Sequence, residues 1–194
     1  MATSYYDDAL IKKIKAWTEK TEITITSPDE TKRLFESISD MNNDKPLKLP
    51  LICIRRKGGY NIINTSKQPL TFDGLRIDAN INRSIQLNAV PIEIQYQIDV
   101  YTRYYKEADE YIRNFVFNII NFPKLTITIP YQSINLEHDS NIRLSSEVED
   151  NSDIPERLIA GQFTRLSLNI NIDDGYLFDT KIRDNYSIVS NVDI

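Results

Sequence analysis

Two segments of the chain alternate strictly between apolar and polar residues. Residues 92–101 place isoleucine, tyrosine or valine at every second position, and within residues 163–173 leucine and isoleucine occupy every second position from Leu166 to Ile172. This period of two is typical of a β-strand with one buried face and one polar face. A third segment, 124–129, alternates in the same way, and Pro130 after it predicts a strand end or a sheet edge.

Helical spacing of apolar residues predicts about three helices. In residues 7–19 the apolar positions follow two aspartates, which suit a helix N-terminus. Ser27-Pro28-Asp29-Glu30 has the pattern of a capping box, and we expect a helix from there through Met41. The widest apolar stripe predicts a helix over residues 107–121 that packs on the strand 92–101 and forms the core. Its members are Ala108, Tyr111, Ile112, Phe115, Val116, Ile119 and Ile120.

Shorter strands are predicted near the N-terminal third of the chain. Residues 22–26 alternate briefly, and residues 47–56 form an apolar run that ends in basic residues. The sequence Lys57-Gly58-Gly59-Tyr60 predicts a tight turn, because glycine adopts turn conformations at no steric cost. Residues 47–56 and 60–63 are therefore expected to form a hairpin.

The remaining segments are less regular. Residues 69–90 predict one or two strands, broken at Gly74, and residues 133–144 alternate weakly. Residues 145–156 are polar and acidic and predict a loop. Asp174-Gly175 is expected to end the last strongly alternating strand.

These elements together predict an α+β fold in a single domain. Six to eight strands that each alternate on one face favour a mostly antiparallel β-sheet flanked by about three helices. Extended loops connect the elements. We expect residues 1–178 to form the domain and residues 179–194, where apolar positions are sparse, to form a C-terminal arm or edge strand.

Composition and charge exclude several classes of protein. A net charge of −5 disfavours a general nucleic-acid binder, which needs a positive surface to displace counterions. No apolar stretch approaches the ~20 residues that cross a bilayer, and the first residues lack the features of a signal peptide. We therefore expect a protein made in a cytoplasm without a membrane partner.

Candidate catalytic and metal-ligating residues are few. Cys53 is the one cysteine, and its apolar surroundings favour a buried structural thiol over a nucleophile. His138 is the one histidine and lies between Glu137 and Asp139. This trio could hold a metal or act as a general base, but a solvated loop is the favoured interpretation. We expect neither a cofactor nor a metal.

Charged clusters offer candidate contact surfaces. Arg55-Arg56-Lys57 could contact phosphate, but in an acidic chain it is better suited to an acidic partner surface. The acidic segment from Glu147 to Asp153 lacks the spacing of a calcium loop and is interpreted as solvated. The polar face of the strand 92–101 either meets water or forms the hydrophilic wall of a ring.

Three of these segments resemble a known family. Residues 91–104, which run into an acidic helix start and an amphipathic helix, are similar to the central segment of the tail-sheath stabiliser and completion proteins of contractile-tailed bacteriophages. Residues 165–177 resemble the late strand of those proteins, and residues 47–54 their first sheet strand. The resemblance covers residues 45–178 and consists mainly of patterns of alternation.

The resemblance implies a non-enzymatic virion protein that forms a hexameric ring. Such a ring caps the tail tube and the last sheath ring at the head-proximal end and offers a docking face to the neck and connector proteins. It is assembled in the host cytoplasm, and DNA only passes through its channel. The chain has no long proline-rich C-terminal extension, so residues 179–194 are expected to hold a neighbour by adding a strand to a sheet edge.

Other functions stay open at this point. A tail terminator of a non-contractile tail, another neck adaptor and a baseplate component fit the same patterns. A metal-dependent enzyme built on His138, and a module that grips nucleic acid with its polar sheet face, fit less well. The residues expected at partner interfaces are Arg55, Arg56, Lys57, Glu147, Glu149, Asp150, Asp153, Asp179, Ile182, Tyr186, Ile188 and Val189.

Overall fold

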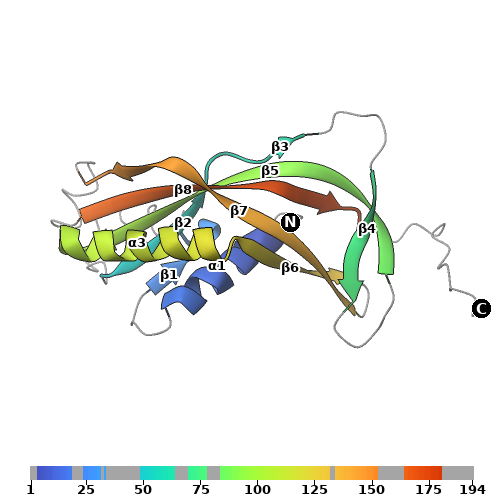
Figure 1. Ribbon diagram of the computed structural model, residues 1–194, viewed down its shortest axis with the longest axis horizontal. Helices are drawn as coiled ribbons and strands as arrows, with labels where there is room; N and C mark the ends of the chain where they lie inside the picture. Colours follow the sequence, from blue (N-terminus) through green and yellow to red (C-terminus); the bar gives the residue numbers. More distant parts are fainter. Residues whose placement is uncertain are drawn as a thin grey trace, which may run out of the picture.

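A single curled sheet organises the part of the chain that the structure describes (Figure 1). The computed structural model describes residues 4–18, 24–31, 33, 49–63, 70–77, 84–131, 134–152 and 164–180. Within these ranges the sheet has eight strands, and the helices lie on one side of it. The predicted α+β class, with a mostly antiparallel sheet and about three helices, is confirmed.

The elements follow one another in a simple order along the chain. The first turn of a further helix occupies residues 28–31, and its predicted continuation to Met41 lies outside the described residues. The named elements are α1 (Ser4–Thr18), β1 (Thr24–Thr26), β2 (Leu51–Arg56), β3 (Asn61–Ile62), β4 (Leu70–Ile77), β5 (Ser84–Thr102), α3 (Tyr105–Asn121), β6 (Lys124–Tyr131), β7 (Ile134–Asp150) and β8 (Thr164–Phe178).

Strand β5 is the centre of the sheet. It pairs antiparallel with β8 along one edge, from Ala89↔Phe178 to Thr102↔Thr164. Along its other edge it pairs antiparallel with β2, β3 and β4 in turn. On the far side of β8 follow β7 and then β6, also antiparallel. Among the described strands, only the short β1–β2 pair is parallel.

The sheet closes on itself at one end. Strand β4, which pairs with β5, also pairs with β7 through Arg76↔Glu137 and Ile77↔Leu136. Strands β4, β5, β8 and β7 therefore form a closed circuit of neighbours, which gives the curl seen in Figure 1. A register shift between Phe72 and Leu75 interrupts the pairing of β4 with β5, close to Gly74, where the sequence predicts a break.

The core lies between the helices and the apolar face of the sheet. Helix α3 turns Ala108, Ile112, Phe115 and Ile119 towards the sheet, where they are buried. A large buried apolar side chain contributes roughly 1.5–3 kcal/mol before entropy costs. The predicted stripe is thus confirmed except at its end, because Ile120 is exposed. The sheet side of the core includes Ile52, Ile54, Ile94, Tyr96, Ile98, Val100, Leu166, Leu168, Ile170 and Ile172.

The predicted hairpin at residues 57–60 is wrong. Strands β2 and β3 do not pair with each other; both pair with β5, so the chain continues along one edge. Lys57 keeps this contact, because its N–H donates to the carbonyl of Gln95 over 2.9 Å. Gly58 has a φ of +78°, a conformation that costs glycine little, and it bulges the chain outward instead of reversing it.

Two predicted ends of strands are also wrong. Residues 145–150 continue β7 instead of forming a loop, and Val148, Glu149 and Asp150 pair with β8 after a register shift that follows Leu144. Strand β8 does not stop at Asp174-Gly175. A register shift there places one extra residue on β8 opposite β5, and the strand then continues to Phe178. A bulge of this kind uses the same polar and glycine residues as a turn.

The predicted capping box is confirmed. The N–H of Ser27 donates to Glu30 Oε2 over 2.8 Å, and the N–H of Glu30 donates to Ser27 Oγ over 3.2 Å. These bonds from Ser27 lower the pKa of the Glu30 carboxyl. Both residues satisfy donors that a helix start would otherwise leave unpaired.

Candidate functional site

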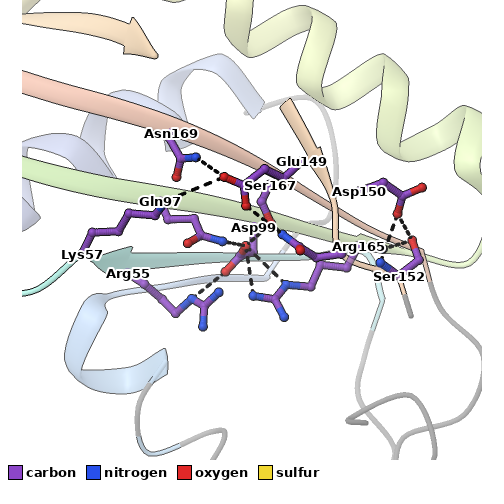
Figure 2. A network of polar contacts seen from close by, with 11 residues as sticks. Arg55, Lys57, Gln97, Asp99, Glu149, Asp150, Ser152, Arg165, Ser167 and Asn169 are labelled. Atoms are coloured by element: carbon purple, nitrogen blue, oxygen red, sulfur yellow. Dashed lines mark hydrogen bonds and ion pairs between the residues drawn. The ribbon is translucent and has the colours of Figure 1, made fainter. Parts of the chain in front are cut away.

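The polar face of the central strands holds a buried cluster of charged and amide side chains, which we call the Asp99 network (Figure 2). Strand register creates it. Asp99 on β5 lies opposite Ser167 on β8, and the next pair along is Gln97 with Asn169. Since side chains two residues apart share a face, these four groups lie together, and Arg55 from β2 joins them opposite Gln97.

The Asp99 carboxylate is fully buried and contacts four groups. The hydroxyl of Ser167 donates to Oδ1 over 2.6 Å, and Gln97 Nε2 donates to the same atom over 2.8 Å. Arg165 Nε lies 3.3 Å from Oδ1, and Arg55 Nε lies 2.7 Å from Oδ2. A carboxylate removed from water needs such partners, because an unpaired buried charge costs several kcal/mol. The network therefore fixes three neighbouring strands in one register.

Two further buried groups border this carboxylate. The Arg165 guanidinium lies over the ring of Tyr101, 5.5 Å from its centroid. Burial raises the pKa of the Tyr101 hydroxyl, and the negative charge of Asp99 raises it further. Burial also raises the pKa of the Cys53 thiol to about 11, so Cys53 is the buried thiol that the sequence predicts. Neither group is poised for chemistry at neutral pH.

The rim of the network extends to strand β7. Glu149 accepts hydrogen bonds from Asn169 Nδ2 over 2.7 Å and from Asn151 Nδ2 over 3.4 Å, and both lower its pKa. Lys57 Nζ lies 3.8 Å from the same carboxylate, with both side chains about 40% exposed. A pair this open adds little to stability, so the amide bonds hold Glu149 in place.

The end of β7 is tied to the start of β8 by a serine. Ser152 Oγ donates to Asp150 Oδ1 over 2.5 Å and accepts the backbone N–H of Arg165 over 3.1 Å. Asn151 Nδ2 also donates to Ser167 Oγ over 2.8 Å. The outer polar residues thus position the arginine and the serine that bind Asp99.

Some of the predicted interface residues converge here and others do not. Arg55, Lys57, Glu149 and Asp150 belong to the network or its rim, while Glu147 is exposed on β7. Asp179 follows β8 and its N–H donates to the carbonyl of Asn88 over 2.8 Å. The predicted interface residues outside the described part of the chain are Asp153, Ile182, Tyr186, Ile188 and Val189.

Arg56 points to the opposite face of the sheet. Its guanidinium pairs with the carboxylate of Asp7 on α1, with Nε 2.9 Å from Oδ1. Tyr96 Oη donates to the same oxygen over 2.8 Å. All three bases of the cluster at residues 55–57 therefore have acidic partners within the chain, and their use by an external partner stays a prediction.

The favoured interpretation of His138 as a solvated residue is wrong. His138 is buried on the core face of β7, with its ring edge-on to Phe72, Tyr176 and Phe178 at centroid distances of 5.0 to 5.6 Å. Its Nε2 lies 3.1 Å from Ser140 Oγ. The closed end of the sheet explains this, because β4 and β8 bring their aromatic residues over β7.

The two acids beside His138 do not join it. Alternation turns Glu137 and Asp139 to the other face of β7, where Asp139 pairs with Lys124 over 2.8 Å and accepts from Thr126 Oγ1. Among the described residues, no three His, Cys, Asp or Glu side chains are grouped so that they could hold a metal ion. The trio of residues 137–139 is thus divided between two environments.

Sequence reasoning missed the β8 half of the network. Arg165, Ser167 and Asn169 are the polar positions of a strand that alternation identified, but alternation alone leaves their partners undefined. The unused signal was charge: the polar face of residues 92–101 carries the acid Asp99, and the polar face of residues 163–173 carries one base, Arg165. An acid on one alternating strand and a base on another favour pairing of the two strands, and Arg165 is the diagonal neighbour of Asp99 in the observed register.

No family model matches the chain, and a search of curated proteins finds no significant match. Among the described residues, no helix has the length and apolar character needed to span a membrane.

Proposed function

We propose that this protein is a structural subunit of a bacteriophage tail, which forms a ring at the head-proximal end of a contractile tail and joins it to the neck. One observation carries this proposal. The three segments that resemble the tail-sheath stabiliser and completion proteins are far apart in sequence, yet they become the adjacent strands β2, β5 and β8. The amphipathic helix after the second segment becomes α3 on the apolar face of those strands.

This arrangement suits an assembly role better than a catalytic one. The conspicuous polar groups, in the Asp99 network, are bonded to one another and hold strands in register. The Ser140–His138 pair is buried beneath aromatic rings, where a substrate has no access. A rigid sheet with charged residues at its rim supplies a fixed shape and a polar contact surface, which is what a ring subunit needs.

Binding to isolated tails tests the proposal. Tails that lack this protein are incubated with purified protein, sedimented, and imaged by negative-stain electron microscopy. We expect the protein to sediment with the tails at a small fixed number of copies per tail and to appear as added density at one end. Density along the whole tube, or no co-sedimentation, would contradict the proposed role.

A further inference from the structure

Strand β6 forms one end of the sheet order (Figure 1). The order runs β1-β2-β5-β4-β7-β6, and among the described strands β6 pairs with β7 alone. The strand at the other end, β1, has three residues, whereas β6 has eight. A strand with one free edge presents backbone N–H and carbonyl groups to another chain. Strand β6 is thus the longer of the two terminal edges.

The hydrogen-bond pattern shows which groups of β6 face outward. The N–H of Ile142 on β7 donates to the carbonyl of Pro123 over 2.8 Å, so Pro123 and Ile142 form a hydrogen-bonded pair. Antiparallel strands alternate between hydrogen-bonded and non-hydrogen-bonded pairs. In the register with β7, the odd-numbered residues of β6 therefore bond to β7. The backbone groups that face away from β7 belong to Lys124, Thr126, Thr128 and Pro130.

This edge is closed at both ends and open in the middle. Lys13 Nζ on α1 donates to the carbonyl of Lys124 over 2.6 Å. Pro130 has no N–H to offer, which suits an outward position on an edge strand. Between them Thr126 and Thr128 each present an N–H and a carbonyl that have no partner among the described residues. The edge can therefore accept a short strand that bonds to these two threonines.

The C-terminal arm carries a sequence that fits this edge. Residues 181–194 follow Thr180, outside the described part of the chain. From residue 186 onward the even positions are apolar except Ser190, and the odd positions are polar except Val189. Strand β6 alternates in the same way, between buried apolar and exposed residues. We call residues 186–194 the arm strand.

Alternation also determines which residues would lie opposite each other. Directly opposed residues in a sheet share a face, so the polar odd residues of the arm strand belong opposite Thr126 and Thr128. Its apolar even residues then continue the buried face of β6. A shift of one residue would reverse both faces and place Asn191 on the apolar side. The two patterns therefore agree in one phase only.

We propose that the arm strand of one copy pairs with the open edge of β6 in a second copy. At Asp179 the chain still follows β5, because the N–H of Asp179 donates to the carbonyl of Asn88. Two strands lie between β5 and β6 by either route around the sheet, β4 and β7 or β8 and β7. The arm would have to cross them to reach β6 of its own chain. Residues 180–186 span ~20 Å when extended, which is enough to reach a neighbouring copy.

This contact can build a ring. Arm and edge are different surfaces, so each copy gives an arm to one neighbour and accepts an arm from the other. Repeated contacts of this kind close into a ring if the rotation between copies allows it. The inference rests on the proposed ring-forming function and assigns the surfaces that join its subunits.

Mixing two defective variants tests the contact directly. The edge variant carries Thr126→Pro and Thr128→Pro, which remove the outward N–H groups and leave the bonds to β7 in place. The arm variant carries Ile188→Asp and Val192→Asp. Sedimentation velocity is measured on full chains over a wide range of concentrations. We expect wild type to form oligomers, each variant alone to be monomeric, and an equal mixture to form a species of twice the chain mass.

Matched controls separate the contact from general effects of substitution. Thr126→Val with Thr128→Val keeps the outward N–H groups, and Ser187→Asp with Asn191→Asp adds the same charge to the polar face of the arm strand. Both controls should assemble as wild type does. Far-UV circular dichroism and thermal unfolding verify that every variant is folded.

Disulfide cross-linking tests the predicted phase without disturbing the contact. A chain with Thr128→Cys is mixed under mild oxidation with a chain that carries one cysteine in the arm strand, while the native Cys53 is buried. We expect covalent dimers with Ser187→Cys, Val189→Cys or Asn191→Cys, and none with Ile188→Cys or Ser190→Cys. If each arm paired with its own chain, the mixture would stay monomeric and a chain with both Thr128→Cys and Ser187→Cys would close an internal disulfide.

The outcomes distinguish this inference from the proposed function. Oligomers that persist in both variants, a wild type that is monomeric at every concentration, or an internal disulfide would overturn the contact. If mixing restores the dimer but the protein ignores tails, the contact stands and the tail function fails. If the protein binds tails while mixing restores nothing, the tail function stands and this contact is wrong.

Discussion

Tyr6, near the start of the chain, is hydrogen-bonded to both backbone groups of Tyr176. The N–H of Tyr176 donates to Tyr6 Oη over 2.6 Å, and Tyr6 O–H donates to the Tyr176 carbonyl over 3.0 Å. Pro91 of β5 lies opposite Tyr176, but its carbonyl accepts the N–H of Ile63 on the other edge of β5. Pro91 and Tyr176 are therefore not hydrogen-bonded to each other, and the N–H and carbonyl of Tyr176 point away from β5. Strand β7 pairs with β8 only as far as Ile172. Helix α1 therefore supplies a hydroxyl where β8 has lost a neighbouring strand.

Replacing Tyr6 by phenylalanine should destabilise the protein. Tyr6 is almost fully buried, and removal of its hydroxyl leaves the part-buried N–H and carbonyl of Tyr176 without these bonds. A buried group that loses its partner costs ~1–3 kcal/mol, so we expect Tyr6→Phe to lower the free energy of unfolding by about that amount. Urea unfolding measures it. Unchanged stability would show that the hydrogen bonds to Tyr176 make no net contribution to the free energy of unfolding.

The same hydroxyl predicts a loss of stability at high pH. Burial raises the pKa of Tyr6 to about 12, from 10.0 in an unfolded chain. The folded state therefore holds this proton more tightly, and the resulting stability is present below pH 10 and lost as the pH rises through 12. We expect the stability difference between wild type and Tyr6→Phe to shrink over this range. A stability difference that stays constant or grows between pH 10 and 12 would contradict the raised pKa of Tyr6.

Asp99→Asn should be strongly destabilising. The substitution keeps the shape of the side chain but leaves Arg165, which is almost fully buried, and Arg55 without their negative partner. Breaking a buried ion pair by removing one partner costs ~3–5 kcal/mol. Glu147→Gln, at an exposed position of β7, is the matched control and should change stability by less than ~0.5 kcal/mol. If the two variants were equally stable, the Asp99 network would make no measurable contribution to the stability of the fold.

Two glycines give opposite predictions for the same substitution. A Cβ at Gly175 would lie 3.1 Å from the carbonyl oxygen of Ile92 and 3.4 Å from Tyr6 Oη, so Gly175→Ala should cost ~1–3 kcal/mol through crowding. A Cβ at Gly59 meets nothing within 4 Å, and Gly59→Ala should be neutral or slightly stabilising. Thermal unfolding of the two variants compares them directly. A harmless Gly175→Ala would mean that the bulge in β8 can relax.

The thiol of Cys53 should be inert in the folded protein. Burial excludes reagents and raises its pKa to about 11, so little thiolate exists at neutral pH. We expect no labelling by a thiol reagent at pH 8 until urea unfolds the chain, and then one label per chain. Rapid labelling of the native protein would mean that strand β2 opens readily.

Local patterns in the sequence predicted most elements, while contacts across the sheet were not predictable. Alternation identified β5, β6 and β8, and the Ser27–Glu30 capping box was readable because both partners lie within one turn. The course of residues 57–63 depended on β5, some thirty residues away, and glycines permit a bulge as readily as a hairpin. The burial of His138 required the closure of β4 onto β7, which no local pattern records.

Only the β5 side of the Asp99 network could be predicted from the sequence, because the network depends on contacts across the sheet. Alternation identifies the polar face of residues 92–101, but it does not distinguish contact with water or a channel from burial against polar groups of another strand. Its burial followed from register with β8, a relation between residues 66 to 68 positions apart. Similarly, the helical spacing that placed Ile120 in the core could not show where the sheet beneath α3 ends.

A cryo-electron microscopy map of a tail assembled with this protein tests the central claim most directly. We expect a closed ring at the head-proximal end of the tail, in which strands β2, β5 and β8 of each copy fit the density as one sheet. A map with the protein at another site, or an intact tail end formed without it, would contradict the claim.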